Sequence, residues 1–180
     1  MYKIQVMLLS ITLSLLLCNN VGATPPAPRE SQVKAVYLNG YSKFIAWPAS
    51  AFSDKNSPFR ICIFGENPFG RSLELAVANE TVKNRPVQAM YLNVLEQVSQ
   101  CQILYVSDSE KIRLNTILDK TRQYPILTVG NLKNFVFKGG MIQFYNHNNH
   151  ISFMIDPATL REAGLEPNAN LLRISEVVKR

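Results

Sequence analysis

The sequence predicts an α/β fold with three layers, in which a mostly parallel central sheet is flanked by helices and a late antiparallel hairpin completes one edge. Three observations support this prediction. Short runs of apolar residues alternate with segments of helical periodicity, two of these runs end at a glycine, and two apolar runs near the C-terminus flank a short polar turn. Strands buried on both faces have continuous apolar runs, and alternating strands and helices are typical of parallel sheets.

The first predicted element is a helix over residues 30–47. Val33, Tyr37 and Phe44 recur at helical spacing and give this segment a broad apolar face. Pro48 is expected to end the helix, because the residue before a proline is pushed out of the helical conformation.

The middle of the chain supplies four predicted strands and two predicted helices. The strands are apolar runs at 59–64, 86–92, 101–106 and 125–129. Asn67-Pro68 is expected to open the first helix, since asparagine is a good N-cap and proline suits the first helical position. The second helix is expected to follow a capping-box pattern from Ser107 to Glu110 and to carry Ile112 on its apolar face.

The last predicted elements are a hairpin and two helices. They comprise hairpin strands at 141–145 and 151–155, a helix that begins at Asp156-Pro157, and a final helix over 170–179. No internal repeat and no domain boundary is visible after the first 30 residues, so the sequence predicts a single domain over 31–180.

Residues 1–23 have the pattern of a cleaved secretory signal. Lys3 precedes an apolar run of about a dozen residues, which is too short to span a membrane, and residues 21–23 are small residues suited to cleavage. The alternatives are an uncleaved anchor and lipid attachment at Cys18, although a large leucine precedes that cysteine. The proline-rich residues 24–30 are expected to form a flexible, extended lead-in.

Cys62 and Cys101 are the two cysteines that remain once the leader is removed. Export to an oxidising compartment favours a disulfide between them, with two buried free thiols as the alternative. Closing a loop of this length would stabilise the fold by roughly 3–4 kcal/mol. The Cys-x-x-Cys spacing of thioredoxin-like proteins is absent, which favours a structural bridge over a catalytic one.

The sequence offers little for catalysis, for metal binding or for nucleic-acid binding. The only histidines, His147 and His150, enclose two asparagines, and this pattern favours a hairpin turn over a metal site. The G-x-S-x-G and G-x-G-x-x-G motifs are absent. The net charge of +6 is scattered, as on a solvated cationic surface. We therefore expect no enzyme, no metal, no cofactor and no nucleic-acid partner.

The first predicted helix is the best candidate for an interaction surface. It carries Tyr37, Tyr41, Phe44 and Trp47. Aromatic anchors favour partner recognition, so these four residues are the predicted partner-binding set. The alternative is that they are ordinary core residues.

Five segments follow one another in a recognisable order: 34–48, 61–65, 101–107, 125–130 and 137–142. The first contains a helix that ends in Trp47-Pro48, and the last contains the step Gly139-Gly140-Met141. Together with the two cysteines, they resemble the YfiR-like family of small exported bacterial proteins. The resemblance covers residues from about 31 to 180.

This resemblance implies a periplasmic, often dimeric protein that represses a membrane-bound diguanylate cyclase. Such a protein would bind the cyclase's periplasmic sensor region, lower cyclic-di-GMP and touch the membrane only through its partner. The resemblance also implies that Cys62 and Cys101 form the family's structural disulfide. Some relatives carry a second bridge in the late hairpin, for which this sequence has no cysteines. Ser152 and Asp156 stand where relatives often have arginine and asparagine.

A different function is that of a periplasmic small-ligand-binding protein serving another membrane sensor, such as a histidine kinase. Its ligand is expected at the carboxyl ends of the strands, near Gly65, Ser107 and Gly130, because open α/β sheets place ligands there.

Overall fold

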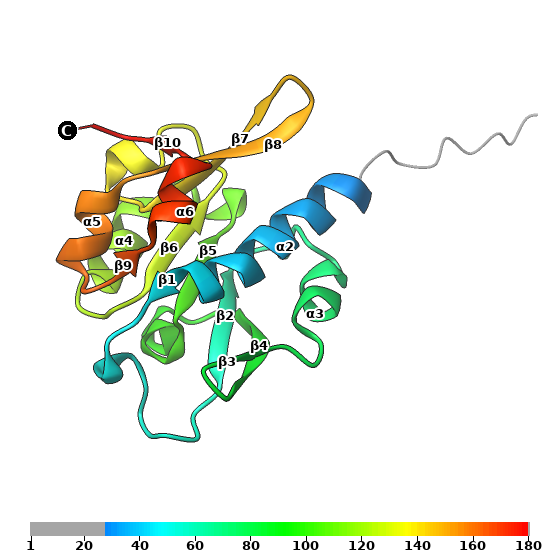
Figure 1. Cartoon of the computed structure of the whole chain (residues 1–180). Coiled ribbons are helices and arrows are strands. Elements are labelled where there is room, and N and C mark those ends of the chain that lie inside the picture. The colour runs from blue at the N-terminus through cyan, green and yellow to red at the C-terminus, as the bar shows by residue number, and fades with distance from the viewer. Residues whose placement is uncertain (1–27, 180) are drawn as a thin grey trace, which may run out of the picture.

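The computed structural model describes residues 28–179 and is built on an eight-stranded sheet (Figure 1). Its strands are β2 (Phe59–Phe64), β3 (Thr81–Val82), β4 (Arg85–Leu92), β5 (Ile103–Val106), β6 (Leu127–Gly130), β7 (Ile142–His147), β8 (His150–Ile155) and β10 (Glu176–Val177). Their order is β10-β8-β7-β6-β5-β2-β4-β3. Strands β4, β2, β5, β6 and β7 are mutually parallel, while β3–β4 and β7–β8 are antiparallel pairs.

Helices cover the two faces of this sheet. They are α2 (Pro28–Phe44), α3 (Ser72–Val77), α4 (Leu114–Thr121), α5 (Pro157–Glu162) and α6 (Ala169–Arg173), with short 3-10 turns η2 (Ala49–Ala51), η3 (Leu95–Gln100), η4 (Asp108–Glu110) and η5 (Val136–Lys138). A separate two-stranded ribbon pairs β1 (Ile45–Ala46) with β9 (Glu166–Pro167). The predicted mostly parallel sheet with flanking helices is confirmed.

The side chains of the central strands point alternately to the two faces of the sheet, and this divides the core into two layers. Ile61 and Ile63 of β2 pack in the apolar cluster that contains α2 and α3, with Leu160 of α5. Cys62 and Phe64 belong to the second cluster, which contains α4 and η3. Because successive side chains of a strand point to opposite faces, the central strands must be apolar throughout, as their runs indicate.

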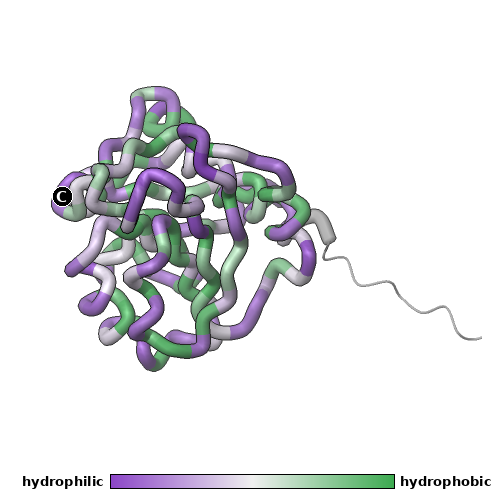
Figure 2. Tube along the Cα trace, turned by 90° about the horizontal axis from the view of Figure 1, so that it is seen from below, coloured by the Kyte–Doolittle hydropathy of each residue, from purple (hydrophilic) through white to green (hydrophobic). Residues whose placement is uncertain are grey.

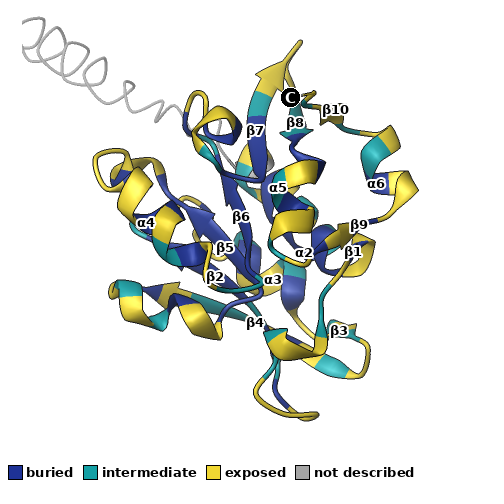
Figure 3. Cartoon of the chain, turned by 90° about the vertical axis from the view of Figure 1, so that its left-hand side faces the viewer, coloured by how far each residue is buried: buried dark blue, intermediate teal, exposed yellow. Residues whose placement is uncertain are grey.

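The distribution of burial follows this layering. In Figure 3, β5 and β6 are buried, whereas the outward surfaces of α4 and α5 are exposed. Figure 2 shows the corresponding hydropathy, with hydrophilic segments on the outer turns of the trace and apolar segments running through it.

Two local predictions are confirmed in detail. The hairpin turns at Asn148 and Asn149, whose φ angles of 49° and 63° are the left-handed values that a two-residue type I′ turn needs. Asp156 is the N-cap of α5, and its carboxylate accepts hydrogen bonds from the backbone N–H groups of Ala158 and Thr159 at 3.1 and 3.3 Å.

The first and last predicted helices are shorter than expected. Helix α2 ends at Phe44, and the next two residues pair with β9 instead of continuing the helix to residue 47. Helix α6 ends at Arg173, and β10 then pairs parallel with β8. In both places the backbone groups find partners on a neighbouring strand, which outweighs weak helical periodicity.

Two predicted helix starts in the middle of the chain are wrong. The Asn67 side chain accepts from the Phe69 backbone N–H at 2.9 Å and donates to the Gly70 carbonyl at 3.0 Å, which forms a turn, and α3 begins only at Ser72. The residues after Ser107 form η4 without a side-chain cap. Helix α4 therefore starts after Ile112, whose side chain is 97% exposed and not in the core.

The predicted leader, residues 1–23, lies outside the described residues, as does most of the predicted lead-in. The part of the chain that is described contains no helix long and apolar enough to cross a membrane.

Replacing Asp156 by alanine tests the cap of α5. This carboxylate is fully buried and also accepts from the Thr159 hydroxyl at 2.8 Å. Asp156→Ala should lower the free energy of unfolding by about 2 kcal/mol, because three donors lose their acceptor. Urea denaturation measures this change. Asp119→Ala, on the exposed side of α4, is the control and should change stability by less than about 0.5 kcal/mol; equal effects in both variants would contradict the capping role.

Candidate functional site

Helix α2 is apolar on both its inner and its outer side. Ala35, Leu38 and Tyr41 face the sheet and are at most 1% exposed. On the outer side, Val36 is 63% exposed and Phe44 is 40% exposed. Only the inner side is needed for the core, so the outer side is an unpaired apolar surface within the described chain.

We call the outward residues Val33, Val36, Gly40 and Phe44 the outer stripe. Their spacing of three and four residues places them along one line of the helix. A Cβ built on Gly40 would meet only the Phe44 ring, at 4.0 Å, so the backbone there lies open to close approach. Shallow apolar hollows lie at each end of the stripe, one beside Val36 and Tyr37, the other between Phe44 and the exposed Ile174 after α6.

The four aromatic residues predicted to bind a partner differ in how far they are buried. Tyr41 is buried, so this part of the prediction is wrong: its ring packs on Phe153 in the core, with centroids 5.4 Å apart. Tyr37 is half-buried against the same Phe153 ring at 5.3 Å. Trp47 is half-buried, and its indole N–H donates to the Gln102 carbonyl at 3.2 Å. Phe44, which is 40% exposed, is the most exposed member of the set.

The Tyr41 hydroxyl is buried and has no hydrogen-bond partner among the described residues. Burial, with a smaller contribution from Tyr37, raises the pKa of Tyr41 well above the ordinary value for tyrosine. The hydroxyl therefore stays neutral, and the residue acts as a core aromatic.

A disulfide joins Cys62 in β2 to Cys101, just before β5. The two Cα atoms are 5.9 Å apart, and both residues are buried beneath α4 and η3. The bridge thus links β2 to the start of β5, its neighbour in the interior of the sheet.

A polar pocket lies at the carboxyl ends of the central strands. After β2 the chain continues to β4, on one side of the neighbouring pair β2 and β5. After β5 it continues to β6, on the other side of this pair. Such a reversal opens a crevice at the carboxyl ends of the two strands, which is where open α/β sheets bind ligands. The residues that line this switch-point pocket are Glu30, Ser31, Lys34, Pro68, Phe69, Tyr105, Ser107, Asp108 and Asn131.

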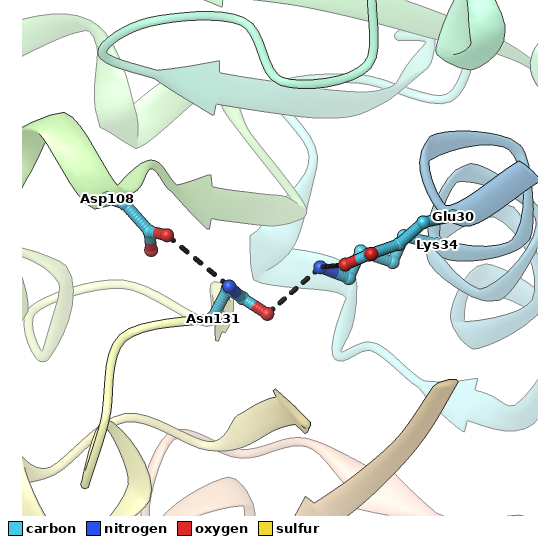
Figure 4. A network of polar contacts seen from close by, with 4 residues as sticks. All are labelled: Glu30, Lys34, Asp108 and Asn131. Carbon is cyan, nitrogen blue, oxygen red and sulfur yellow. Dashed lines mark hydrogen bonds and ion pairs between the residues drawn. The ribbon is translucent and has the colours of Figure 1, made fainter. Parts of the chain in front are cut away.

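A chain of polar contacts forms one wall of the pocket (Figure 4). The ammonium group of Lys34 lies 2.6 Å from the Glu30 carboxylate and donates to the Asn131 amide oxygen at 2.9 Å. The Asn131 amide nitrogen donates to Asp108 at 3.3 Å. The side chain of Lys34 is only 9% exposed, so this network holds a mostly buried cation at the end of the sheet.

Two buried aromatic side chains, Phe69 and Tyr105, also line the pocket. The rings of Phe69 and Tyr105 meet edge to face, with centroids 4.8 Å apart. Tyr105 is 2% exposed, and its hydroxyl makes no hydrogen bond to any described residue. Burial, followed by the charges of Asp108 and Glu30, raises the pKa of Tyr105, so the hydroxyl remains a neutral donor and acceptor.

The two histidines lie next to the hairpin turn, where they pair across the strands and are exposed. Within residues 28–179 no group of three histidine, cysteine or carboxylate side chains is placed to hold a metal ion.

Comparison with known proteins identifies the family to which this chain belongs. A family model described as YfiR/HmsC-like matches residues 31–176, which is most of the chain. The chain belongs to the YfiR/HmsC-like family. Proteins of this family are periplasmic regulators without enzymatic activity, and the disulfide is consistent with an oxidising compartment. The suspected family is thus confirmed.

One solved structure supports the fold at a distance. It is the crystal structure of a conserved domain protein from Vibrio cholerae O1 biovar El Tor, with a TM-score of 0.50 and 9% sequence identity. The match covers 67% of this chain and 54% of that one, so the YfiR/HmsC-like chain spans about half of its structural neighbour. A search of curated proteins gave no significant match.

Replacing Tyr41 by phenylalanine tests its assignment to the core. The buried hydroxyl lacks a partner, so Tyr41→Phe should leave the free energy of unfolding unchanged or raise it by about 1 kcal/mol. Tyr145→Phe is the matched control, because that hydroxyl donates to Glu176 at 2.7 Å. Denaturant titration compares the two, and a loss of more than about 1 kcal/mol in Tyr41→Phe would contradict the assignment.

Proposed function

We propose that this periplasmic regulator represses a membrane-bound diguanylate cyclase by binding its periplasmic sensor region, which lowers cyclic-di-GMP. The observation that carries the proposal is the outer stripe of α2. Membership in a family of periplasmic regulators supports a role in binding and not in chemistry.

The outer stripe has the physical properties of a docking surface. Its apolar side chains remain exposed although the same helix is anchored by a fully apolar inner side. Exposed apolar patches on stable proteins mark interaction sites. Gly40 at its middle would allow a partner helix to approach closely, while Val36 and Phe44 would fill the spaces on either side.

Charge substitutions in the outer stripe test this proposal. Val36→Glu and Phe44→Glu should each weaken retention of the cyclase by at least tenfold and raise cellular cyclic-di-GMP, because a carboxylate would be buried without a partner. Ile112→Glu is the matched control, since it also replaces an exposed apolar side chain, on the other layer of the fold. Pull-down from membranes and nucleotide measurement provide the readouts.

Several outcomes of this experiment are informative. Unchanged cyclic-di-GMP in both stripe variants, at unchanged unfolding midpoints, would contradict the proposal. A second copy of the chain is the competing occupant of the stripe. If wild type is a dimer by light scattering, Val36→Glu is monomeric, and no cyclase is retained by either, the stripe is a self-association surface instead.

Replacing Cys62 by serine tests whether the disulfide controls repression. Loss of the bridge should lower the free energy of unfolding by roughly 3–4 kcal/mol, out of about 5–15 kcal/mol for a typical domain. We expect a lower steady-state amount of protein and higher cyclic-di-GMP. Denaturant titration of the purified variant, immunoblotting and nucleotide measurement check each step. Normal cyclic-di-GMP in cells with this variant would argue against a redox switch.

A second candidate function is that of a small-ligand-binding protein serving another membrane sensor, such as a histidine kinase. The switch-point pocket favours it, because it is a concave polar site at the position where open α/β sheets bind ligands. Detection of ligand binding by the purified protein tests this function without any membrane partner.

A further inference from the structure

The switch-point pocket has a size that suits a small polar molecule. Its volume is about 270 Å³, which is slightly below the range typical of drug-sized ligands. It is lined by four parts of the chain that the fold brings together: the first turns of α2, the loop after β2, the end of β5 with the residues that follow it, and the residue that follows β6. The site therefore exists only in the folded protein.

The hydrogen-bonding groups of the polar wall are mixed and only partly used. Lys34 has three N–H donors, of which Glu30 and Asn131 take two. One N–H of the Asn131 amide is engaged by Asp108, and each carboxylate keeps acceptor positions. The Tyr105 hydroxyl can both donate and accept. Donors and acceptors thus alternate within one small site, which matches hydroxyl groups, since each hydroxyl is itself a donor and an acceptor.

The charges of the pocket disfavour ionic ligands. An anion would be repelled by Glu30 and Asp108, while Lys34 already makes an ion pair at 2.6 Å. A cationic ligand would meet the Lys34 ammonium, which already pairs with Glu30, so Asp108 is the one lining carboxylate without an ion pair to a described residue. A neutral ligand avoids both costs because it can share hydrogen bonds with the existing network.

Apolar residues complete the lining of the pocket. Phe69, Tyr105 and the exposed Pro68 also line the pocket, and each of the two rings is 2% exposed, so only a small part of each ring reaches it. A sugar ring has hydroxyls around its edge and apolar C–H groups on its faces, so it can bond to the polar chain while its C–H groups contact Pro68 and the accessible parts of the rings. Tyr105 is 2% exposed and its hydroxyl makes no hydrogen bond to a described residue, so a ligand in the pocket would supply its partner.

We propose that the switch-point pocket binds a neutral polyhydroxy ligand of monosaccharide size. The inference deepens the second candidate function and is independent of the cyclase. It assigns Tyr105 and Asp108 to hydrogen bonds with ligand hydroxyls, and the exposed Pro68, together with the accessible part of Phe69, to contact with the apolar face of the sugar ring.

Calorimetric titration of the purified protein with small molecules tests this inference. The probes are glucose, galactose, mannose and ribose, with putrescine as a cation and inorganic phosphate as an anion. At least one sugar should bind at one site per chain with a Kd of about 1 mM or tighter. Tyr105→Phe and Asp108→Asn should each weaken that binding by at least tenfold.

Matched controls separate loss of contact from loss of fold. Tyr145→Phe and Asp119→Asn remove the same chemical groups at residues that do not line the pocket, and should leave sugar affinity within twofold of wild type. Tyr105→Phe removes a hydroxyl with no partner, so the unfolding midpoint should not fall. Saturation-transfer NMR on the bound sugar should show the strongest transfer to its C–H groups.

The outcomes distinguish this inference from the functions proposed above. Binding of no sugar, or sugar binding that the Tyr105 and Asp108 variants do not affect, would overturn it. Binding of putrescine or phosphate alone, sensitive to the same variants, would overturn the ligand class while leaving a small-ligand-binding function intact. None of these results bears on retention of a cyclase by the outer stripe.

Discussion

The parallel pairing of β2 with both β4 and β5 is the constraint on which the rest of the structure depends. It puts β2, the first long strand, in the interior of the sheet, so both of its faces need cover. Helix α2 supplies one cover and α4 the other. The same pairing makes the chain leave β2 and β5 in opposite directions, and this reversal creates the crevice that becomes the switch-point pocket.

The disulfide acts on this same pair of strands. Cys62 lies within β2, and Cys101 lies just before β5, so the bridge restricts the unfolded chain at the point where the central pairing must form. Its contribution of roughly 3–4 kcal/mol in the loop-entropy model is a large share of a typical domain's stability. Loss of the bridge would therefore weaken every surface that the central sheet positions, and not only the residues near the sulfur atoms.

The sequence predicted the central strands well because burial on both faces requires continuous apolar runs. The hairpin and the Asp156 cap were also predictable, since asparagines in left-handed conformations and an aspartate before a proline are strong local signals. The ribbon of β1 with β9 and the strand β10 were missed because two-residue strands have no periodicity. Their formation depends on a neighbouring backbone edge that only the tertiary fold supplies.

The candidate sites were harder to predict for a related reason. Helical periodicity showed that α2 is apolar but not which apolar residues face outward, so buried Tyr41 was chosen and exposed Val36 was not. The apolar residues of α2 cover a wider arc of the helix than one buried face needs. This excess was the sequence signal that some of them face outward. In the pocket, Ser107 and Gly130 marked the correct edge of the sheet, but Lys34 and Asn131 are 97 residues apart and meet only through the fold.

Helix α2 is the element that joins the two proposed sites. Its first turns supply Glu30 and Lys34 to the pocket, while its outer side carries the stripe from Val33 to Phe44. A ligand shifts a conformational equilibrium only by the difference between its affinities for the two states. A pocket ligand that hydrogen-bonds Lys34 favours whichever position of α2 leaves that lysine beside Asn131. If the partner binds best to the same position of α2, ligand and partner strengthen each other's binding by the same factor, and if it prefers another position, they weaken each other equally.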